Sequence, residues 1–259
     1  MSGAPLAGRR ILVTRRPEQA SDLIGRLSQL GATVIAVPAI AVAAPEDPEP
    51  FDAALTRLRD YGWLILTSGN AVKAVADRLA LRGLPSALRG PAIASVGPAT
   101  TRALAERFPG RAVDLEPVAD FRAEGLLAAF AERGWPRSQR CLIPQSDRGR
   151  DVLAVGLRAQ GALVDVVVAY RTVAPAGFAE SLANARRERI DLALFASPSA
   201  VEGFVAAAGQ DARALPVAAI GPTTAEAARG AGLNVLGVAS SSTIDDLVAV
   251  AVRCLTSQP

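Results

Sequence analysis

The chain has 259 residues, none of them histidine, and its 28 lysine plus arginine residues against 25 aspartate plus glutamate residues give a formal net charge of +3. The missing histidine excludes Ser-His-Asp and Cys-His catalysis and imidazole metal ligands. So small a charge excess does not indicate a nucleic-acid-binding surface. Two cysteines, Cys141 and Cys254, are too few for a disulfide framework or a zinc cluster, so we expect no metal site.

No apolar run approaches the roughly 20 residues that a membrane span needs. The first ten residues hold Arg9 and Arg10 but no apolar core before a cleavage site. We therefore expect a cytoplasmic protein that does not contact a membrane.

Short apolar runs rich in Val, Ile, Leu and Ala recur along the chain. Such runs are typical of strands buried on both faces of a parallel sheet. The predicted strands are 11–15, 33–40, 63–68, 92–96, 113–116, 140–145, 163–171, 192–196, 217–221 and 235–239.

Helices are predicted between these strands. The segment 17–30 begins with Pro17 and ends before Gly31, which is the usual placement of proline and glycine at helix ends. The segments 149–160 and 222–229 are bounded in similar ways, and the alternation of strands and helices predicts doubly wound parallel sheets.

The sequence also repeats itself once. Four pairs of similar segments occur in the same order in the two halves, which indicates a duplication and hence two domains of about 120–130 residues each. The pairs are 10–34 with 140–164, 64–72 with 194–201, 95–104 with 219–228, and 124–130 with 245–251.

Polar loops rich in hydroxyl residues follow the predicted strands and open the helices. Helix starts expose unpaired N–H groups that bind anions, and such sheets bind ligands beyond the carboxyl ends of their strands. Serine and threonine are also ordinary helix caps, so one such loop alone predicts nothing. The sequence has neither G-x-x-x-x-G-K-[ST] nor G-x-G-x-x-G, which argues against a nucleotide enzyme and leaves us expecting no cofactor.

Tyr170 and several arginines stand at predicted strand ends. A phenol carries its proton at neutral pH and can donate it or a hydrogen bond, and arginine binds carboxylates in a bidentate manner. Each of these side chains is also an ordinary residue for a solvated strand end. Tyr61 is the second tyrosine of the chain.

Together these segments resemble uroporphyrinogen-III synthases over residues 8–252. The resemblance rests on ILVTRRPEQA (11–20), LSQLGATV (27–34), WLILTSGNAV (63–72), ASVGPATTRAL (94–104), VVAYRT (167–172), LALFASPSAV (192–201), AAIGPTTAEAARGAG (218–232) and SSSTIDDL (240–247). It implies two flavodoxin-like α/β domains, each a doubly wound parallel sheet, joined by a two-stranded linker. The implied first domain is 1–38 plus 172–259, the second is 43–165, and the linker strands are 39–42 and 166–171.

The resemblance further implies a lyase of tetrapyrrole and haem biosynthesis. Its substrate is hydroxymethylbilane, a linear tetrapyrrole polycarboxylate, which it dehydrates and cyclises with inversion of the last pyrrole to give uroporphyrinogen III. Tyr170 matches a tyrosine that the family places in its cleft, so it is the candidate proton donor or orienting group. The implied substrate-binding residues are Thr14, Arg15, Thr67, Ser68, Asn70, Gly97, Thr100, Thr101, Arg148, Arg171, Ser197, Ser199, Gly221, Thr223 and Thr224. Ala196 stands where a hydroxyl residue is common in the family.

Two other readings fit the same architecture. One is a non-catalytic, hinge-type two-lobed binding protein for a small acidic ligand, and the other is a two-lobed transferase that uses a nucleotide-activated donor. We expect a monomer that binds a small molecule and no nucleic acid, with transient contact to the preceding pathway enzyme.

Overall fold

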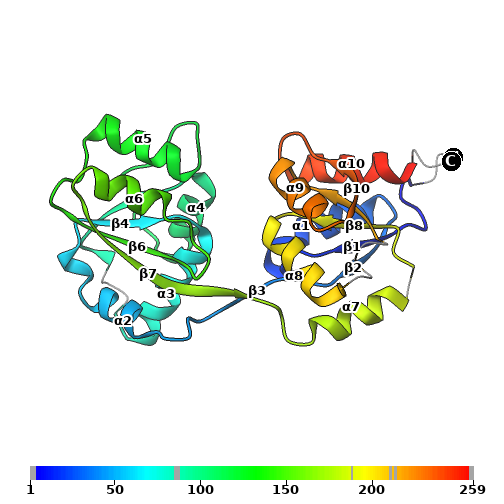
Figure 1. Ribbon diagram of the computed structural model, residues 1–259, viewed down its shortest axis with the longest axis horizontal. Coiled ribbons are helices and arrows are strands. Elements are labelled where there is room, and N and C mark those ends of the chain that lie inside the picture. The colour runs from blue at the N-terminus through cyan, green and yellow to red at the C-terminus, as the bar shows by residue number, and fades with distance from the viewer. Residues whose placement is uncertain (1–3, 85–87, 188, 210–211, 213–214, 257–259) are drawn as a thin grey trace. The chain divides into compact units, whose positions relative to one another are not determined.

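The apolar runs form two separate five-stranded sheets in the computed structural model, which describes residues 4–84, 88–187, 189–209, 212 and 215–256. Each sheet belongs to one compact unit: unit 1 is Met1–Ala41 with Val173–Pro259, and unit 2 is Val42–Thr172. The chain therefore leaves unit 1 after Ala41 and re-enters it at Val173 (Figure 1).

The sheet of unit 1 has the strand order β2-β1-β8-β9-β10, and its neighbouring strands pair in parallel. This is the flavodoxin order, in which the chain winds first to one side of the central strand and then to the other. The strands are β1 (Arg10–Val13), β2 (Thr33–Ala36), β8 (Leu192–Phe195), β9 (Pro216–Ala219) and β10 (Asn234–Val238).

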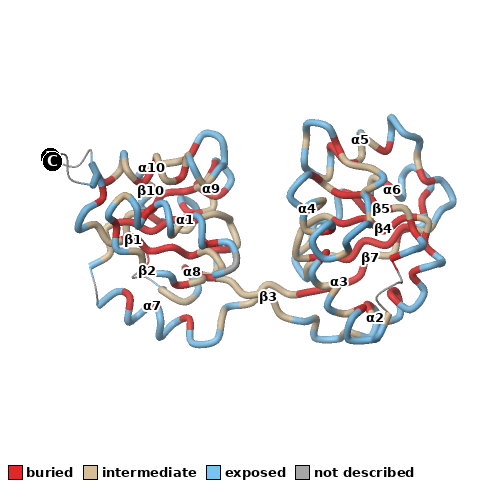
Figure 2. The backbone as a smooth tube through the Cα atoms, turned by 180° about the vertical axis from the view of Figure 1, so that it is seen from behind, coloured by how far each residue is buried: buried red, intermediate tan, exposed pale blue. Residues whose placement is uncertain are grey.

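Helices cover both faces of this sheet and bury its aliphatic residues (Figure 2). Leu23, Leu27 and Leu247 pack on one face, and Phe178 and Phe204 pack on the other. The helices on the first face are α1 (Pro17–Gln29) and α10 (Ile244–Thr256), and those on the second are α7 (Phe178–Arg187), α8 (Pro198–Ala208) and α9 (Pro222–Gly230).

The sheet of unit 2 has the strand order β3-β7-β6-β4-β5. The pairs from β7 to β5 are parallel. Its strands are β3 (Ala41–Ala43), β4 (Trp63–Leu66), β5 (Ala92–Ser95), β6 (Arg140–Ser146) and β7 (Leu163–Val173). One face carries α2 (Glu49–Thr56), α3 (Gly69–Leu81), α4 (Pro98–Arg107) and the short 3-10 helix η1 (Leu58–Asp60), and the other carries α5 (Ala123–Arg133) and α6 (Val152–Ala159).

The predicted α/β class with doubly wound parallel sheets is confirmed. The strand predicted at 113–116 is wrong, because Leu115 makes only an isolated parallel bridge to Ala94. Residues 166–171, for which a linker strand is predicted, lie within β7 and extend the sheet of unit 2 beside β6. The bounds of the predicted domains and linker strands remain a prediction.

The two units do not coincide with the two repeated halves of the sequence, because each unit contains strands from both halves. Strands β1 and β2 in unit 1 correspond to β6 and β7 in unit 2, while β8 and β9 correspond to β4 and β5. Both sheets consequently show the same order of corresponding strands, β2-β1-β8-β9 and β7-β6-β4-β5. Each unit thus contains one piece from each half of the chain.

Gly203 on α8 marks a close approach of helix and backbone near the point where the chain leaves unit 1. A Cβ atom on Gly203 would lie 2.4 Å from the carbonyl oxygen of Ala39, whereas a Cβ on Gly25 of α1 would meet nothing within 4 Å. Gly203 is therefore required by packing, and Gly25 is not.

Substitution of these two glycines by alanine should give opposite results. Gly25→Ala should raise the free energy of unfolding by about 0.5–1 kcal/mol, because alanine is the better helix former. Gly203→Ala should lower it by about 1–3 kcal/mol, because the added methyl group forces the helix off Ala39. Urea unfolding measures the free energy of unfolding of each variant. If both substitutions stabilise the protein, α8 does not approach the Ala39 backbone as closely as described.

Candidate active site

The carboxyl edge of the unit 2 sheet holds a cavity of about 270 Å³. Loops that follow β4, β5 and β6 contribute to its wall together with Tyr170 of β7, so it lies at the point where the winding of the sheet reverses between β4 and β6. Its lining residues are Thr67, Ser68, Val96, Phe121, Arg122, Ala123, Ile143, Gln145, Ser146, Gly149, Arg150, Leu153, Ala154 and Tyr170.

Ser68 and Tyr170 meet in this cavity. The Ser68 hydroxyl caps α3 by accepting a hydrogen bond from the Ala71 N–H at 3.1 Å, and it lies 3.1 Å from the Tyr170 phenol oxygen. Either hydroxyl can donate in the second bond. When Ser68 donates, the phenol proton is left free for a group in the cavity, and the chain of hydrogen bonds polarises it.

A β-bulge turns Tyr170 toward α3. Val168 pairs with Gln145 and Tyr170 pairs with Ser146, so Ala169 is an extra residue in β7. Side chains normally alternate between the faces of a sheet, but Ala169 and Tyr170 both pack into the core on the α3 face. The bulge therefore brings the phenol to the side where Ser68 stands.

The loop after β6 is tied to the same end of β7. The Asp147 N–H donates to the Tyr170 carbonyl at 3.1 Å, and the Asp147 carboxylate accepts from the Thr172 N–H at 3.2 Å. Arg148, a predicted substrate-binding residue, stands exposed on this loop, with its N–H directed to the Ser146 hydroxyl at 3.3 Å. The backbone around Tyr170 is thus fixed from two directions.

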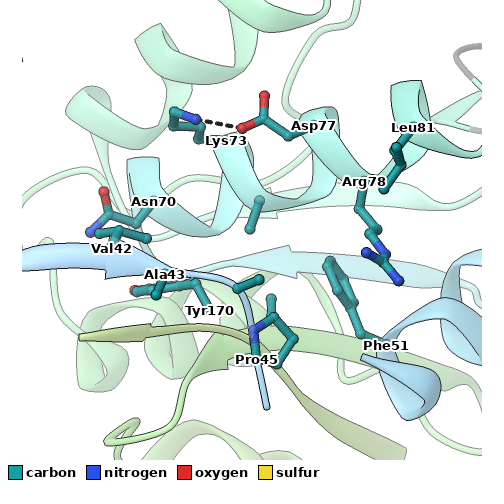
Figure 3. A pocket seen from close by; sticks show the side chains of 13 residues that line it. Val42, Ala43, Pro45, Phe51, Asn70, Lys73, Asp77, Arg78, Leu81 and Tyr170 are labelled. Atoms are coloured by element: carbon teal, nitrogen blue, oxygen red, sulfur yellow. Dashed lines mark hydrogen bonds and ion pairs between the residues drawn. The ribbon is translucent and has the colours of Figure 1, made fainter. Parts of the chain in front are cut away.

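A second cavity, of about 260 Å³, also borders Tyr170. Helix α3 provides Asn70, Lys73 and Asp77 on one side, and the segment 42–45 lies opposite (Figure 3). Asn70 lines this second cavity, so the structure separates it from Thr67 and Ser68. Lys73 forms an ion pair with Asp77.

Arg171 stands beside the second cavity. Its Nε donates to the Ala44 carbonyl at 3.1 Å, and its guanidinium forms an ion pair with Glu46. These contacts hold the segment 44–46 against β7. Arg171 could bind a substrate carboxylate, as predicted, only by giving up its ion pair with Glu46.

The predicted residues at the start of α4 form a hydrogen-bonded group of their own. The buried Ser95 hydroxyl accepts from the Gly97 N–H at 3.1 Å and from the Thr101 hydroxyl at 2.8 Å, and Thr101 also contacts Glu116. Thr100 is buried. The Gly97 N–H and the Thr101 hydroxyl, both predicted to bind substrate, are therefore already hydrogen-bonded to other residues of unit 2.

In unit 1 the predicted residues gather after β1, β8 and β9. The fully buried Thr14 hydroxyl donates to the Leu194 carbonyl at 2.8 Å, which links the ends of β1 and β8. The Arg15 Nε atom is buried with no hydrogen-bond partner, and desolvation followed by the charge of Arg16 lowers the pKa of its guanidinium. Ser197 caps α8 through the Ala200 N–H at 3.1 Å, and Ser199 follows in the first turn, partly exposed.

Gly221 opens α9 because a side chain there would collide with a neighbouring loop. A Cβ atom on Gly221 would lie 2.4 Å from the Ser242 hydroxyl oxygen. In the first turn of α9, Thr223 is exposed and Thr224 is buried. Thr223 is therefore the side chain of this group that is open to a ligand.

Tyr61 lies at the opposite, amino edge of the unit 2 sheet. Its phenol donates to the Asp165 carboxylate at 2.7 Å, and Arg140 binds the same carboxylate at 2.8 Å. Burial and then the Asp165 hydrogen bond raise the pKa of Tyr61 to about 12. Tyr61 is thus a structural residue, and Tyr170 is the tyrosine at the cavity.

Phe121, Arg122 and Leu153 also line the first cavity and are not among the residues predicted from the sequence. Phe121 lies five residues beyond the end of the predicted strand 113–116 and outside the hydroxyl-rich loops, so the pattern of strand ends could not find it. A lone aromatic residue in the polar stretch 116–122 was the available signal. Within the described residues, no group of three or more Cys, Asp or Glu side chains could hold a metal ion, and no helix is long and apolar enough to cross a membrane.

The fold and site define a protein of two flavodoxin-type units with polar loops at the carboxyl edges of parallel sheets. The model of the family described as uroporphyrinogen-III synthase HemD matches residues 21–249. A uroporphyrinogen-III synthase from Synechococcus elongatus is 35% identical over 206 residues, which cover 79% of this chain and 76% of that protein. A porphyrin biosynthesis protein HemD from Ruminiclostridium josui is 33% identical over 94% of this chain and 48% of that protein. This chain belongs to the uroporphyrinogen-III synthase family.

The crystal structure of a mutant uroporphyrinogen III synthase from Thermus thermophilus has the same fold. It matches with a TM-score of 0.65 and 18% identity, and the match covers 97% of this chain and 100% of that one.

The loop before α10 is built around Asp246. The Asp246 carboxylate accepts hydrogen bonds from the N–H and hydroxyl groups of both Ser240 and Ser241. Hydrogen bonds from the two serine hydroxyls are the main cause that lowers the pKa of Asp246 to about 2. Ser240 and Ser241 therefore hold the loop 240–243 against the first turn of α10.

Replacement of Asp246 by asparagine should lower the melting temperature by a few degrees at pH 7. Because the pKa of Asp246 is lower in the folded state than in the unfolded state, its contribution is present above about pH 4 and is lost as the pH falls toward about 2. The difference between wild type and Asp246→Asn should accordingly narrow over this range. Asp245→Asn is the control and should change the melting temperature little, because within the described part of the chain Asp245 forms an ion pair only with the exposed Arg26. A constant difference at every pH would contradict the assignment.

Proposed function

We propose that this chain dehydrates and cyclises hydroxymethylbilane to uroporphyrinogen III, with Tyr170 as the residue next to the departing hydroxyl group. Membership of the uroporphyrinogen-III synthase family supports the reaction. The observation that carries the residue assignment is the Ser68–Tyr170 hydrogen bond at the carboxyl-edge cavity of unit 2.

The substrate supplies much of the driving force for this reaction. The lone pair of the terminal pyrrole nitrogen expels the hydroxymethyl oxygen, and the C–O bond breaks to give an azafulvene cation. A proton donated to that oxygen lets it leave as water. The methylene carbon of the cation then bonds to the substituted α-carbon of the last pyrrole, which gives a spiro intermediate. The older bond from this α-carbon to the neighbouring methylene bridge breaks and regenerates an azafulvene cation on the neighbouring ring. The free α-carbon of the last pyrrole bonds to that cation and loses its proton, so the ring is inverted as the macrocycle closes.

Tyr170 is suited to hold or donate that proton. Tyr170 is 8% exposed, so it is shielded from bulk water, and Ser68 is the hydrogen-bond partner of its phenol oxygen among the residues that the structure describes. When the Ser68 hydroxyl donates, the Ala71 N–H and the Ser68 hydroxyl form a chain of hydrogen bonds that ends on the phenol oxygen. In this arrangement the phenol proton is available in the cavity, and the chain stabilises negative charge that develops on the oxygen.

Orientation of the chain of pyrroles is the second task of the enzyme. Closure at the substituted carbon requires the substrate to be held in one bent conformation, and this restraint lowers the barrier without further chemical groups. The carboxylates of the substrate are suited to exposed arginines and to the N–H groups at helix starts. Arg148, Thr67, Ser199 and Thr223 are accessible for this role in the two units.

The proposal includes the predicted organisation of the protein. The first domain is 1–38 plus 172–259, the second is 43–165, and the chain acts as a cytoplasmic monomer with transient contact to the preceding enzyme. The two crossings of the chain, after Ala41 and after Thr172, support this division. No observation on the described residues favours the non-catalytic binding protein or the nucleotide-dependent transferase.

Tyr170→Phe should lower kcat for hydroxymethylbilane at least about tenfold, because one hydrogen bond at the transition state contributes about 1.4 kcal/mol or more. Tyr61→Phe is the matched control: it should reduce stability through the loss of the Asp165 bond and leave kcat unchanged. The assay separates the type III and type I isomers of the product without added cofactor. Wild-type enzyme that yields only the type I isomer at the spontaneous rate would contradict the function, and an unchanged kcat in Tyr170→Phe would remove Tyr170 from the mechanism.

A further inference from the structure

We propose that Phe121 and Arg150 form a subsite that holds one carboxylated pyrrole ring of the substrate beside Tyr170. The ring plane would lie on the Phe121 side chain, and an acetate or propionate group of that ring would bind the Arg150 guanidinium. This inference rests on the proposed function and adds two specificity-determining residues to it.

Phe121 is an aromatic side chain held partly open at the cavity. It is 48% exposed although it is large and apolar, and it lines the same cavity as Ser68 and Tyr170. An exposed aromatic ring at the wall of a cavity is a common feature of a ligand-binding surface.

The position of Phe121 is fixed by Gly97. A Cβ atom on Gly97 would lie 2.8 Å from the Cβ of Phe121, so the glycine makes room for this side chain. Gly97 is itself held by the hydrogen bond from its N–H to the buried Ser95 hydroxyl. The residue after Phe121, Arg122, is anchored by its ion pair with Asp120. The ring is therefore presented by a braced loop.

Arg150 supplies the charge that a carboxylate requires. It is exposed, it lines the cavity, and it makes no ion pair with any residue that the structure describes. The neighbouring guanidinium of Arg122 is neutralised by Asp120, and the Asp147 carboxylate is bound by the Thr172 N–H. Arg150 thus remains available for an incoming carboxylate.

The loop that carries Arg150 is ordered by close contacts. A Cβ atom on Gly149 would lie 2.3 Å from the side-chain amide carbon of Gln145, and the Gly149 N–H donates to the Ser146 carbonyl at 2.9 Å. The same loop is tied to Tyr170 through the Asp147 N–H. An apolar ring surface, an unpaired guanidinium and a phenol consequently converge on one cavity, which matches a flat pyrrole with acidic substituents.

The test measures KM and kcat for hydroxymethylbilane in five variants. Arg150→Gln should raise KM about tenfold and change kcat less than about twofold, because a charge-assisted hydrogen bond to the ground-state substrate is lost. Arg150→Lys should restore part of the affinity, because lysine keeps the charge but not the bidentate geometry. Phe121→Leu should raise KM about threefold, because leucine fills the space beside Gly97 without an aromatic face.

The control is Arg59→Gln, which removes the same charge from an exposed arginine near Tyr61 at the amino edge of the same sheet and should leave KM unchanged. In the double variant Arg150→Gln/Phe121→Leu, KM should rise less than the product of the two single effects, because both side chains hold the same ring. Thermal unfolding verifies that each variant is folded.

A KM of Arg150→Gln equal to that of Arg59→Gln, in an enzyme that still forms the type III isomer, would overturn the subsite and leave the proposed function intact. If the increase in KM of the double variant equals the product of the two single increases, Phe121 and Arg150 do not hold the same pyrrole ring. Loss of type III formation by the wild-type protein itself would instead overturn the proposed function.

Discussion

The hydrogen bond between Ser68 and Tyr170 spans the carboxyl end of β6, because Ser68 follows β4 and Tyr170 belongs to β7, and β6 lies between these strands. It forms only because the extra residue Ala169 turns the phenol to the face of α3. The loop after β6 then closes around the same residue through Asp147. The chemistry proposed here depends on this one bridge, since it sets the position of the phenol and, with Ser68 as the donor, leaves the phenol proton available in the cavity.

Among the described residues of unit 1, no hydrogen bond corresponds to the Ser68–Tyr170 bridge of unit 2, although the two sheets have the same order of corresponding strands. Ser197 after β8 corresponds to Ser68 after β4, and each caps the following helix through a main-chain N–H. At the end of β1 the buried Thr14 hydroxyl instead joins the Leu194 carbonyl. By the offset of 130 residues between the repeats, Ile40 in the segment after β2 corresponds to Tyr170 of β7. We infer that the proton-donating group belongs to unit 2 and that the loops of unit 1 serve binding.

Apolar runs and helix-start prolines predicted most strands and helices, because burial on both faces of a parallel sheet leaves a continuous apolar signature. The exchange of halves between the units could not be derived from periodicity and came from the family resemblance. Local patterns also failed at the bulge in β7, since Ala169 and Tyr170 look like any alternating pair. Thr14 directly follows β1 and Thr101 lies in the first turn of α4, but only tertiary structure shows that their hydroxyls bond to Leu194 and Ser95.

In the proposed reaction an oriented phenol and a restrained substrate act without a group that titrates near neutrality. The chain has no histidine. The hydrogen bond from Arg78 lowers the pKa of Asp52, and burial raises the pKa of Cys141 to about 11 and of Tyr61 to about 12. The dependence of kcat on pH tests this claim most directly. The account predicts a kcat for type III formation that is constant within about twofold from pH 6 to 8. A titration of kcat with an apparent pKa inside that range, at constant protein stability, would contradict it.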